Sequence, residues 1–177
     1  MRRQKGFSLI ELLIVVAIIL IIAAIAIPNL LRAKMAANEA SAVGSLRTIA
    51  TSEASYLASG WSNGVNPIGY SGTLQQLGGA ACGNPGFIPT ANTACLIDNA
   101  LATAIPGGPA KSGYNFLYQI TANSGPTNTG FSVNGDPITP GQTGQRHFFT
   151  DGSGVIRANS TQPAGAGTTR FNRAMFN

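Results

Sequence analysis

Charged side chains are scarce in this sequence. Only 10% of its 177 residues are Asp, Glu, Lys or Arg, and the net charge of +5 overstates the basic character of the chain. Arg2, Arg3 and Lys5 supply three of the 11 basic side chains; without them eight basic side chains face six acidic ones, a balance of +2. Beyond these three, the sequence contains no dense cluster of basic residues and no stretch in which basic and aromatic residues alternate. Direct nucleic-acid binding is therefore not expected.

The sequence also lacks the motifs of common active sites. It has one histidine, His147, and neither a nucleophile elbow nor a phosphate loop nor a paired histidine–carboxylate motif accompanies it. We therefore interpret His147 as a sheet residue, and we expect no enzymatic activity and no cofactor.

Cysteine is limited to Cys82 and Cys95. Two cysteines and a distant histidine do not have the spacing of a structural zinc site, so no metal is expected there. If this part of the chain lies outside the cytoplasm, the expected state is a disulfide that closes a loop of about 14 residues and contributes about 3 kcal/mol.

One long apolar segment lies near the amino terminus. From Leu12 to Ile27 no side chain is charged or polar. The stretch from Phe7 to Ile27, about 21 residues at 1.5 Å per residue, makes a helix of about 31 Å, enough to cross the hydrocarbon core of a bilayer. Glu11 lies inside this stretch, where a carboxylate costs roughly 2.5–3.5 kcal/mol and is usually paired or functional.

A partner for Glu11 arises if the chain is cut between Gly6 and Phe7. The cut exposes a cationic α-amino group about one helical turn away, and the amine of one helix can neutralise Glu11 of its neighbour when such helices associate. An ordinary secretory signal, cleaved near residues 24–26, and a simple signal anchor are the alternatives. Both leave Glu11 without a role, and an apolar core longer than 7–15 residues disfavours the secretory signal.

The start of the chain resembles a known family. Residues 2–6, Arg-Arg-Gln-Lys-Gly, precede residues 7–12, Phe-Ser-Leu-Ile-Glu-Leu. This run is similar to the leader and cleavage motif of bacterial type IV prepilins and of the related type II secretion pseudopilins, and the similarity extends to residue 31. The resemblance implies a leader over residues 1–6, cleavage after Gly6 and N-methylation of Phe7. It also implies that Glu11 guides assembly and that the helix bends at Pro28.

The same resemblance implies a function and a set of partners. The expected function is the structural subunit of a pilus-like filament, stored in the bacterial inner membrane with its head outside the cytoplasm and then polymerised. The expected partners are other pilin copies, a prepilin peptidase, an assembly ATPase and a platform protein. The mature polymer is expected to be an extracellular pilus, with a periplasmic pseudopilus as the alternative. A membrane-anchored binding module that never polymerises and an envelope-anchored enzyme are further alternatives.

A calcium site would favour the pseudopilin. The resemblance makes Asp151, alone or together with Asp136, a calcium candidate, because an analogous region binds calcium in some major pseudopilins. The two residues do not have the spaced carboxylates of an EF-hand loop, so turn chemistry is the favoured interpretation of Asp151.

After Pro28 the helix is expected to continue over residues 29–59 and to end at Gly60. Apolar residues recur there at spacings of three and four, which predicts an amphipathic helix with one apolar stripe. The predicted stripe consists of Val43, Leu46, Ala50, Ala54 and Leu57.

The remaining chain predicts loops followed by a sheet. A single turn is expected over residues 73–77 and a short helix over 95–104. Alternation over residues 114–121 predicts a strand, residues 131–133 suggest a second, and residues 146–150 and 155–157 flank a glycine-containing turn. The expected fold class is α+β, in which the long amino-terminal helix packs against an antiparallel sheet of about four strands. Residues 7–27 form the membrane part, residues 28–177 form the head, and the tail after Asn159 is expected to be mobile or loosely paired.

Overall fold

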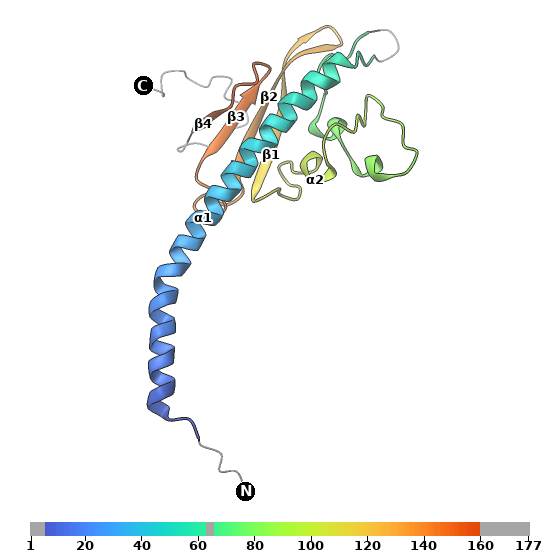
Figure 1. Ribbon diagram of the computed structural model, residues 1–177. Coiled ribbons are helices and arrows are strands. Elements are labelled where there is room, and N and C mark those ends of the chain that lie inside the picture. Colours follow the sequence, from blue (N-terminus) through green and yellow to red (C-terminus); the bar gives the residue numbers. More distant parts are fainter. Residues whose placement is uncertain (1–5, 63–65, 160–177) are drawn as a thin grey trace.

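We describe a computed structural model of the chain over residues 6–62 and 66–159. The basic residues of the expected leader and the expected tail lie outside the described residues. The described part consists of one long helix and a head built on it (Figure 1).

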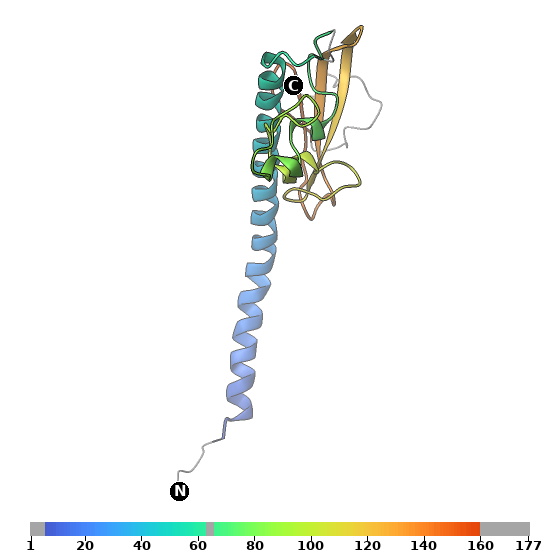
Figure 2. The same cartoon turned by 90° about the vertical axis from the view of Figure 1, so that its right-hand side faces the viewer.

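The long helix, α1, runs over Leu9–Ala58 and has Pro28 inside it. Its 50 residues make a rod of about 75 Å at 1.5 Å per residue. Figures 1 and 2 show the amino-terminal half of α1 projecting away from the head, while the carboxy-terminal half lies along it. The axis of α1 curves in Figure 1, and assigning this bend to Pro28, which cannot donate a helical hydrogen bond, stays a prediction.

Four strands form one antiparallel sheet in the order β1-β2-β3-β4. Their bounds are Tyr114–Ser124 for β1, Thr127–Pro137 for β2, His147–Asp151 for β3 and Arg157–Asn159 for β4. The expected α+β fold, a long helix against an antiparallel sheet of about four strands, is confirmed.

The last strand begins later than the sequence predicts. Residues 155–157 were expected to pair, but β4 starts at Arg157. Asp151 accounts for the shift, because its carboxylate accepts a hydrogen bond from the backbone N–H of Ser153 and its carbonyl accepts one from Gly154. Gly154 has a φ of 70°, which glycine adopts readily. Because of this turn, the first residues of the predicted strand do not pair with β3.

The core lies between α1 and one face of the sheet. Leu46, Ile49 and Tyr56 of α1 are fully buried, as are Phe116 of β1 and Val133 of β2. The predicted helix stripe is therefore only partly right. Ala54 and Leu57, two of its five members, are exposed. The buried face is instead rotated toward the set Glu39, Ala42, Ser45, Leu46, Ile49, Ser52, Glu53 and Tyr56.

Short helices connect α1 to the sheet. They are η1 over Leu74–Leu77, η2 over Ala80–Gly83 and α2 over Asn99–Ala102. The predicted turn over residues 73–77 corresponds to η1. Of the predicted helix over residues 95–104, only α2 is helical. Two bonds explain the difference: the backbone N–H groups of Leu96 and Ile97 both donate to the carbonyl of Leu77, which holds this stretch out of a helix until Asp98 caps α2.

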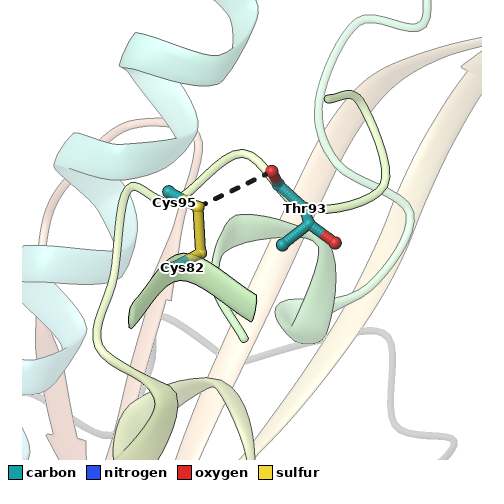
Figure 3. The surroundings of a disulfide bond; sticks show 3 residues. All are labelled: Cys82, Thr93 and Cys95. Atoms are coloured by element: carbon teal, nitrogen blue, oxygen red, sulfur yellow. Dashed lines mark hydrogen bonds between the residues drawn. A yellow bond between two sulfur atoms is a disulfide. The ribbon is translucent and has the colours of Figure 1, made fainter. Parts of the chain in front are cut away.

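The disulfide between Cys82 and Cys95 is present, as expected (Figure 3). The Sγ atom of Cys95 lies 3.8 Å from the carbonyl oxygen of Thr93, a contact without a hydrogen bond because a disulfide sulfur carries no hydrogen. The closed loop also binds α1, since the Tyr56 hydroxyl donates to the Ala91 carbonyl at 2.7 Å. The disulfide thus braces a connecting segment against the helix.

Replacing both cysteines with serine is expected to lower the free energy of unfolding by about 3 kcal/mol, because the open loop has more conformational freedom in the unfolded state. Urea denaturation of the full chain in detergent measures this loss. Wild-type protein treated with a thiol reductant is the control and should show a similar shift. A double variant as stable as the oxidised wild type would contradict this role of the disulfide.

Candidate functional site

The described head leaves the amino-terminal half of α1 uncovered, and most of the exposed large apolar side chains lie there. The large apolar side chains of this half, from Leu9 to Leu31, and that of Phe7 just before the helix are 45–75% exposed. Among the described helices, α1 alone is long and apolar enough to cross a membrane. Contiguous apolar surface of this size requires a bilayer or a protein partner to cover it.

Glu11 lies in the first turn of α1, where a carboxylate complements the positive end of the helix dipole. The helix begins two residues later than the sequence suggests, because Ser8 takes the N-cap position and the N–H of Leu12 donates to its carbonyl at 3.2 Å. Phe7 therefore precedes the helix in the uncleaved chain. Glu11 makes no ion pair with any described residue. Cleavage after Gly6, methylation of Phe7 and the assembly role of Glu11 stay predictions.

A polar clamp joins α1 to the base of the head. The carboxylate of Glu39 accepts hydrogen bonds from the backbone N–H of Gln145 at 2.9 Å and from Arg146 Nε at 2.7 Å, and Asn38 Nδ2 donates to the carbonyl of Thr143 at 2.8 Å. Burial by itself raises the pKa of Glu39, but these donors outweigh it, so the pKa lies below its usual value. The clamp fixes the position along α1 at which the head begins.

A second carboxylate of α1, Glu53, is fully buried. It accepts hydrogen bonds from the Ser71 hydroxyl and from the Ser71 backbone N–H, the latter at 3.0 Å. The Tyr118 hydroxyl in turn donates to the Ser71 carbonyl at 2.8 Å. Burial raises the pKa of Glu53 more than these hydrogen bonds lower it. Glu53 thus connects α1, the loop before η1 and β1.

The two carboxylates predict opposite pH dependences. A raised pKa in the folded state means that the stability due to Glu53 is fully present below about pH 4.5 and is lost as the pH rises through the folded-state pKa. Glu53→Gln cannot ionise and keeps an oxygen that accepts from Ser71. We expect its stability to equal that of the wild type near pH 4 and to exceed it at pH 7, as measured by urea denaturation.

Glu39→Gln is the matched variant on the same helix. Because the pKa of Glu39 is lowered, its stabilising contribution is present above about pH 4.5 and is lost as the pH falls through the folded-state pKa. This variant should be less stable than the wild type at pH 7 and should approach it in acid. Curves with the same pH dependence for both variants would show that this assignment is wrong.

The structure places the two calcium candidates in separate interactions. Asp136 Oδ1 lies 2.7 Å from Nδ1 of His147, and Asp151 Oδ2 accepts a hydrogen bond from Arg157 Nη1 at 2.9 Å. Asp151 pairs with Ser132 in the sheet register, so the two carboxylates are roughly 13 Å apart along the strands. A Ca²⁺ ion with ligands at 2.3–2.6 Å cannot bridge them. In the described part of the chain, no three His, Cys, Asp or Glu residues are grouped as metal ligands.

A shallow groove beside β1 has a volume of about 270 Å³ and is mainly apolar. Tyr118 is its one ionisable lining residue, and burial raises the pKa of its hydroxyl, which already donates to Ser71. The groove brings together no nucleophile and base. Its lining residues are Gly72, Thr73, Leu74, Gln75, Ile105, Pro106, Phe116, Leu117 and Tyr118.

Sequence reasoning missed the polar residues that join α1 to the head. His147 is a buried sheet residue, as expected, but its pairing with Asp136 was not foreseen. Glu39 and Glu53 were not singled out by the sequence, because neither belongs to the predicted apolar stripe. Their partners lie far away in the sequence, so only the spacing of the two acids on one helical face offered a signal.

Comparisons with known proteins agree on one family. Residues 1–27 match the family model of the prokaryotic N-terminal methylation motif. The type IV major pilin protein PilA of Myxococcus xanthus is 32% identical over 128 residues, covering 69% of this chain and 54% of that protein. The type IV wide pilus major component PilA4 of Thermus thermophilus is 67% identical over 39 residues, covering 22% of this chain and 30% of that protein.

These alignments span about half or less of the length of the two relatives. No solved structure matches the chain. Residues 1–27, which match the methylation motif, include most of the bare apolar part of α1. By name, one relative is a type IV major pilin and the other is a major component of a type IV wide pilus. The chain is therefore similar to type IV pilins, and these matches support its assignment to that family.

Proposed function

We propose that this chain is the structural subunit of a type IV pilus-like filament. The observation that carries the proposal is the bare half of α1, which exposes apolar side chains from Phe7 to Leu31 and carries one carboxylate, Glu11. The names of the two relatives, both of which are described as major pilus components, support the same function. The role is structural and does not require catalysis by the head.

In this proposal the chain passes through two environments. The apolar helix first lies in the bacterial inner membrane with the head outside the cytoplasm. A prepilin peptidase then cleaves after Gly6 and methylates Phe7, and an assembly ATPase and platform protein drive polymerisation. The apolar helices leave the lipid and cover one another in the core of the filament, while the heads form its outer surface.

The chemistry of Glu11 explains why the helices would associate in one register. An unpaired carboxylate in an apolar environment is costly, and the amine of Phe7 on an adjoining copy would neutralise it. The contact joins one end of a subunit to a different part of the next, so it does not close on itself. Heterologous contacts of this kind generate open helical polymers.

The type II secretion pseudopilin is the alternative. It shares the amino-terminal motif, and a calcium site at Asp151 would favour it. In the structure the Asp151 carboxylate accepts hydrogen bonds from Ser153 and Arg157, and it lies far from Asp136 along the sheet. This arrangement and the names of the relatives favour the pilus.

Electron microscopy of sheared surface material tests the proposal. Cells that produce the chain should yield long filaments that bind an antibody against the head, and cells without the gene should not. A chain found only in the membrane fraction, with no labelled filaments, would contradict the proposed function. Short labelled filaments confined to the periplasm would indicate the pseudopilin.

A further inference from the structure

Three exposed basic residues of α1 have no acidic partner. They are Arg32, Lys34 and Arg47, and none of them forms an ion pair within the described residues. Among the described residues, the ion pairs are Lys111–Asp98, Arg146–Glu39 and Arg157–Asp151, and His147 is hydrogen-bonded to Asp136.

The described acidic side chains are almost all engaged within the chain itself. All six of its Asp and Glu side chains lie in the described residues. Three of them form the ion pairs, Asp136 is hydrogen-bonded to His147, and Glu53 is fully buried against Ser71. Glu11 alone is unpaired, and it lies at the other end of the apolar segment. Within the described residues, Arg32 and Lys34 therefore have no carboxylate partner and are open to an anion from outside the protein.

Arg32 and Lys34 occupy a bare section of α1. They follow the exposed apolar residues Leu30 and Leu31 and precede the first contacts of the head, which Asn38 and Glu39 make. Two residues apart on a helix of 3.6 residues per turn, the two cations point about 200° apart. A partner protein docked on one face would reach only one of them, whereas a layer that surrounds the helix reaches both.

Their depth matches the surface of a bilayer. Leu9 to Leu31 spans about 34 Å of helix, slightly more than a hydrocarbon core of about 30 Å. The long side chains of Arg32 and Lys34 can extend along apolar surface and hold their charges at the headgroup layer. Arg47 lies about 20 Å further along α1 than Lys34, beside the head and beyond that layer.

We propose that Arg32 and Lys34 form a collar that binds anionic phospholipid headgroups on the outer face of the membrane in which the subunit is stored. The proposal rests on the membrane-stored stage of the proposed function. A guanidinium can hold a phosphate with two hydrogen bonds, and an ammonium adds a point charge. Basic residues on the translocated side run against the usual charge bias of membrane proteins, and lipid phosphate gives them a partner. The collar would hold the head a short distance above the bilayer.

The experiment compares phosphatidylglycerol binding to full-length variants. Each chain is reconstituted in vesicles of phosphatidylcholine with or without phosphatidylglycerol, extracted in mild detergent and examined by native mass spectrometry for retained lipid. The wild type should retain phosphatidylglycerol, and Arg32→Gln/Lys34→Gln should bind it about 30-fold more weakly. Arg47→Gln, which removes one charge from the same helix outside the collar, should stay within about twofold of the wild type.

Three results would overturn the inference. They are equal lipid binding by the double variant and the wild type, a comparable loss in Arg47→Gln, or displacement of the lipid by an oligonucleotide at lower concentrations than phosphatidylglycerol. Flotation of the vesicles in carbonate separates the inference from the proposed function. Chains that float but show no difference in lipid binding make only the collar wrong, whereas chains that do not float at all contradict the membrane-stored stage and the collar together.

Discussion

Glu11→Ala is expected to reduce surface filaments at least tenfold while it increases retention of the subunit in the membrane. The two effects have one cause. Removing the carboxylate saves the roughly 2.5–3.5 kcal/mol that an acid costs in a bilayer, so the helix is more stable in lipid. The same change removes the partner for the amine of an adjoining Phe7. Quantitative immunoblots of the sheared and membrane fractions measure both effects.

Two further variants separate charge from shape at this position. Glu11→Gln keeps the size of the side chain and removes its charge, so it should fail to assemble as the alanine variant does. Glu11→Asp keeps the charge and should retain part of the filament yield. A Glu11→Ala chain that assembled as well as the wild type would favour a membrane-anchored binding module.

Phe116→Ala is expected to lower the free energy of unfolding of the head by about 3–5 kcal/mol. The ring is fully buried between the sheet and α1, and a Cβ added at Gly135 of the neighbouring strand would lie 3.2 Å from its Cε1 atom and 3.6 Å from Cδ1 of Leu46. Truncating the ring therefore leaves a cavity where the helix meets the sheet. Urea denaturation of the full chain in detergent measures the loss.

Leu117→Ala is the matched control on the same strand. Leu117 points to the opposite face of the sheet and is half-buried, so its truncation should cost about 1 kcal/mol. A similar cost for the two substitutions would mean that the packing of β1 on α1 is not the main source of stability in the head.

Local patterns were enough to predict the main elements. The alternation of Tyr114, Phe116 and Tyr118 predicted β1, because a half-buried strand needs only a period of two. Gly60 was expected to end the long helix, and it adopts a φ of 64° directly after the helix. These signals depend on residues close in the sequence.

Burial that depends on distant partners could not be predicted in the same way. Glu53 is a polar residue by sequence, yet it lies in the core because Ser71, on a loop far along the chain, supplies two hydrogen bonds. Leu57 is apolar by sequence, yet it is 46% exposed because no described element covers that side of α1. Which face of α1 packs on the sheet is therefore determined by tertiary contacts, and the spacing of apolar residues along the helix does not reveal these contacts.

The candidate assembly site, too, has features that a local pattern predicts and features that depend on residues distant in the sequence. The apolar segment and Glu11 were visible in the sequence because a membrane helix carries its own signal. The clamp at Glu39 was not, since Gln145 and Arg146 lie more than a hundred positions away in the chain. Hydrogen bonds between such distant segments require the folded structure to be known.

Intact-mass spectrometry of subunits from purified filaments is the sharpest test of the pairing between the Phe7 amine and Glu11. We predict one mature chain that begins at Phe7 and carries a single methyl group on its amine, which can neutralise Glu11 of another copy. A filament subunit that retained Met1, or one that began after Ile27, would contradict it, because the amine and the carboxylate could not then pair.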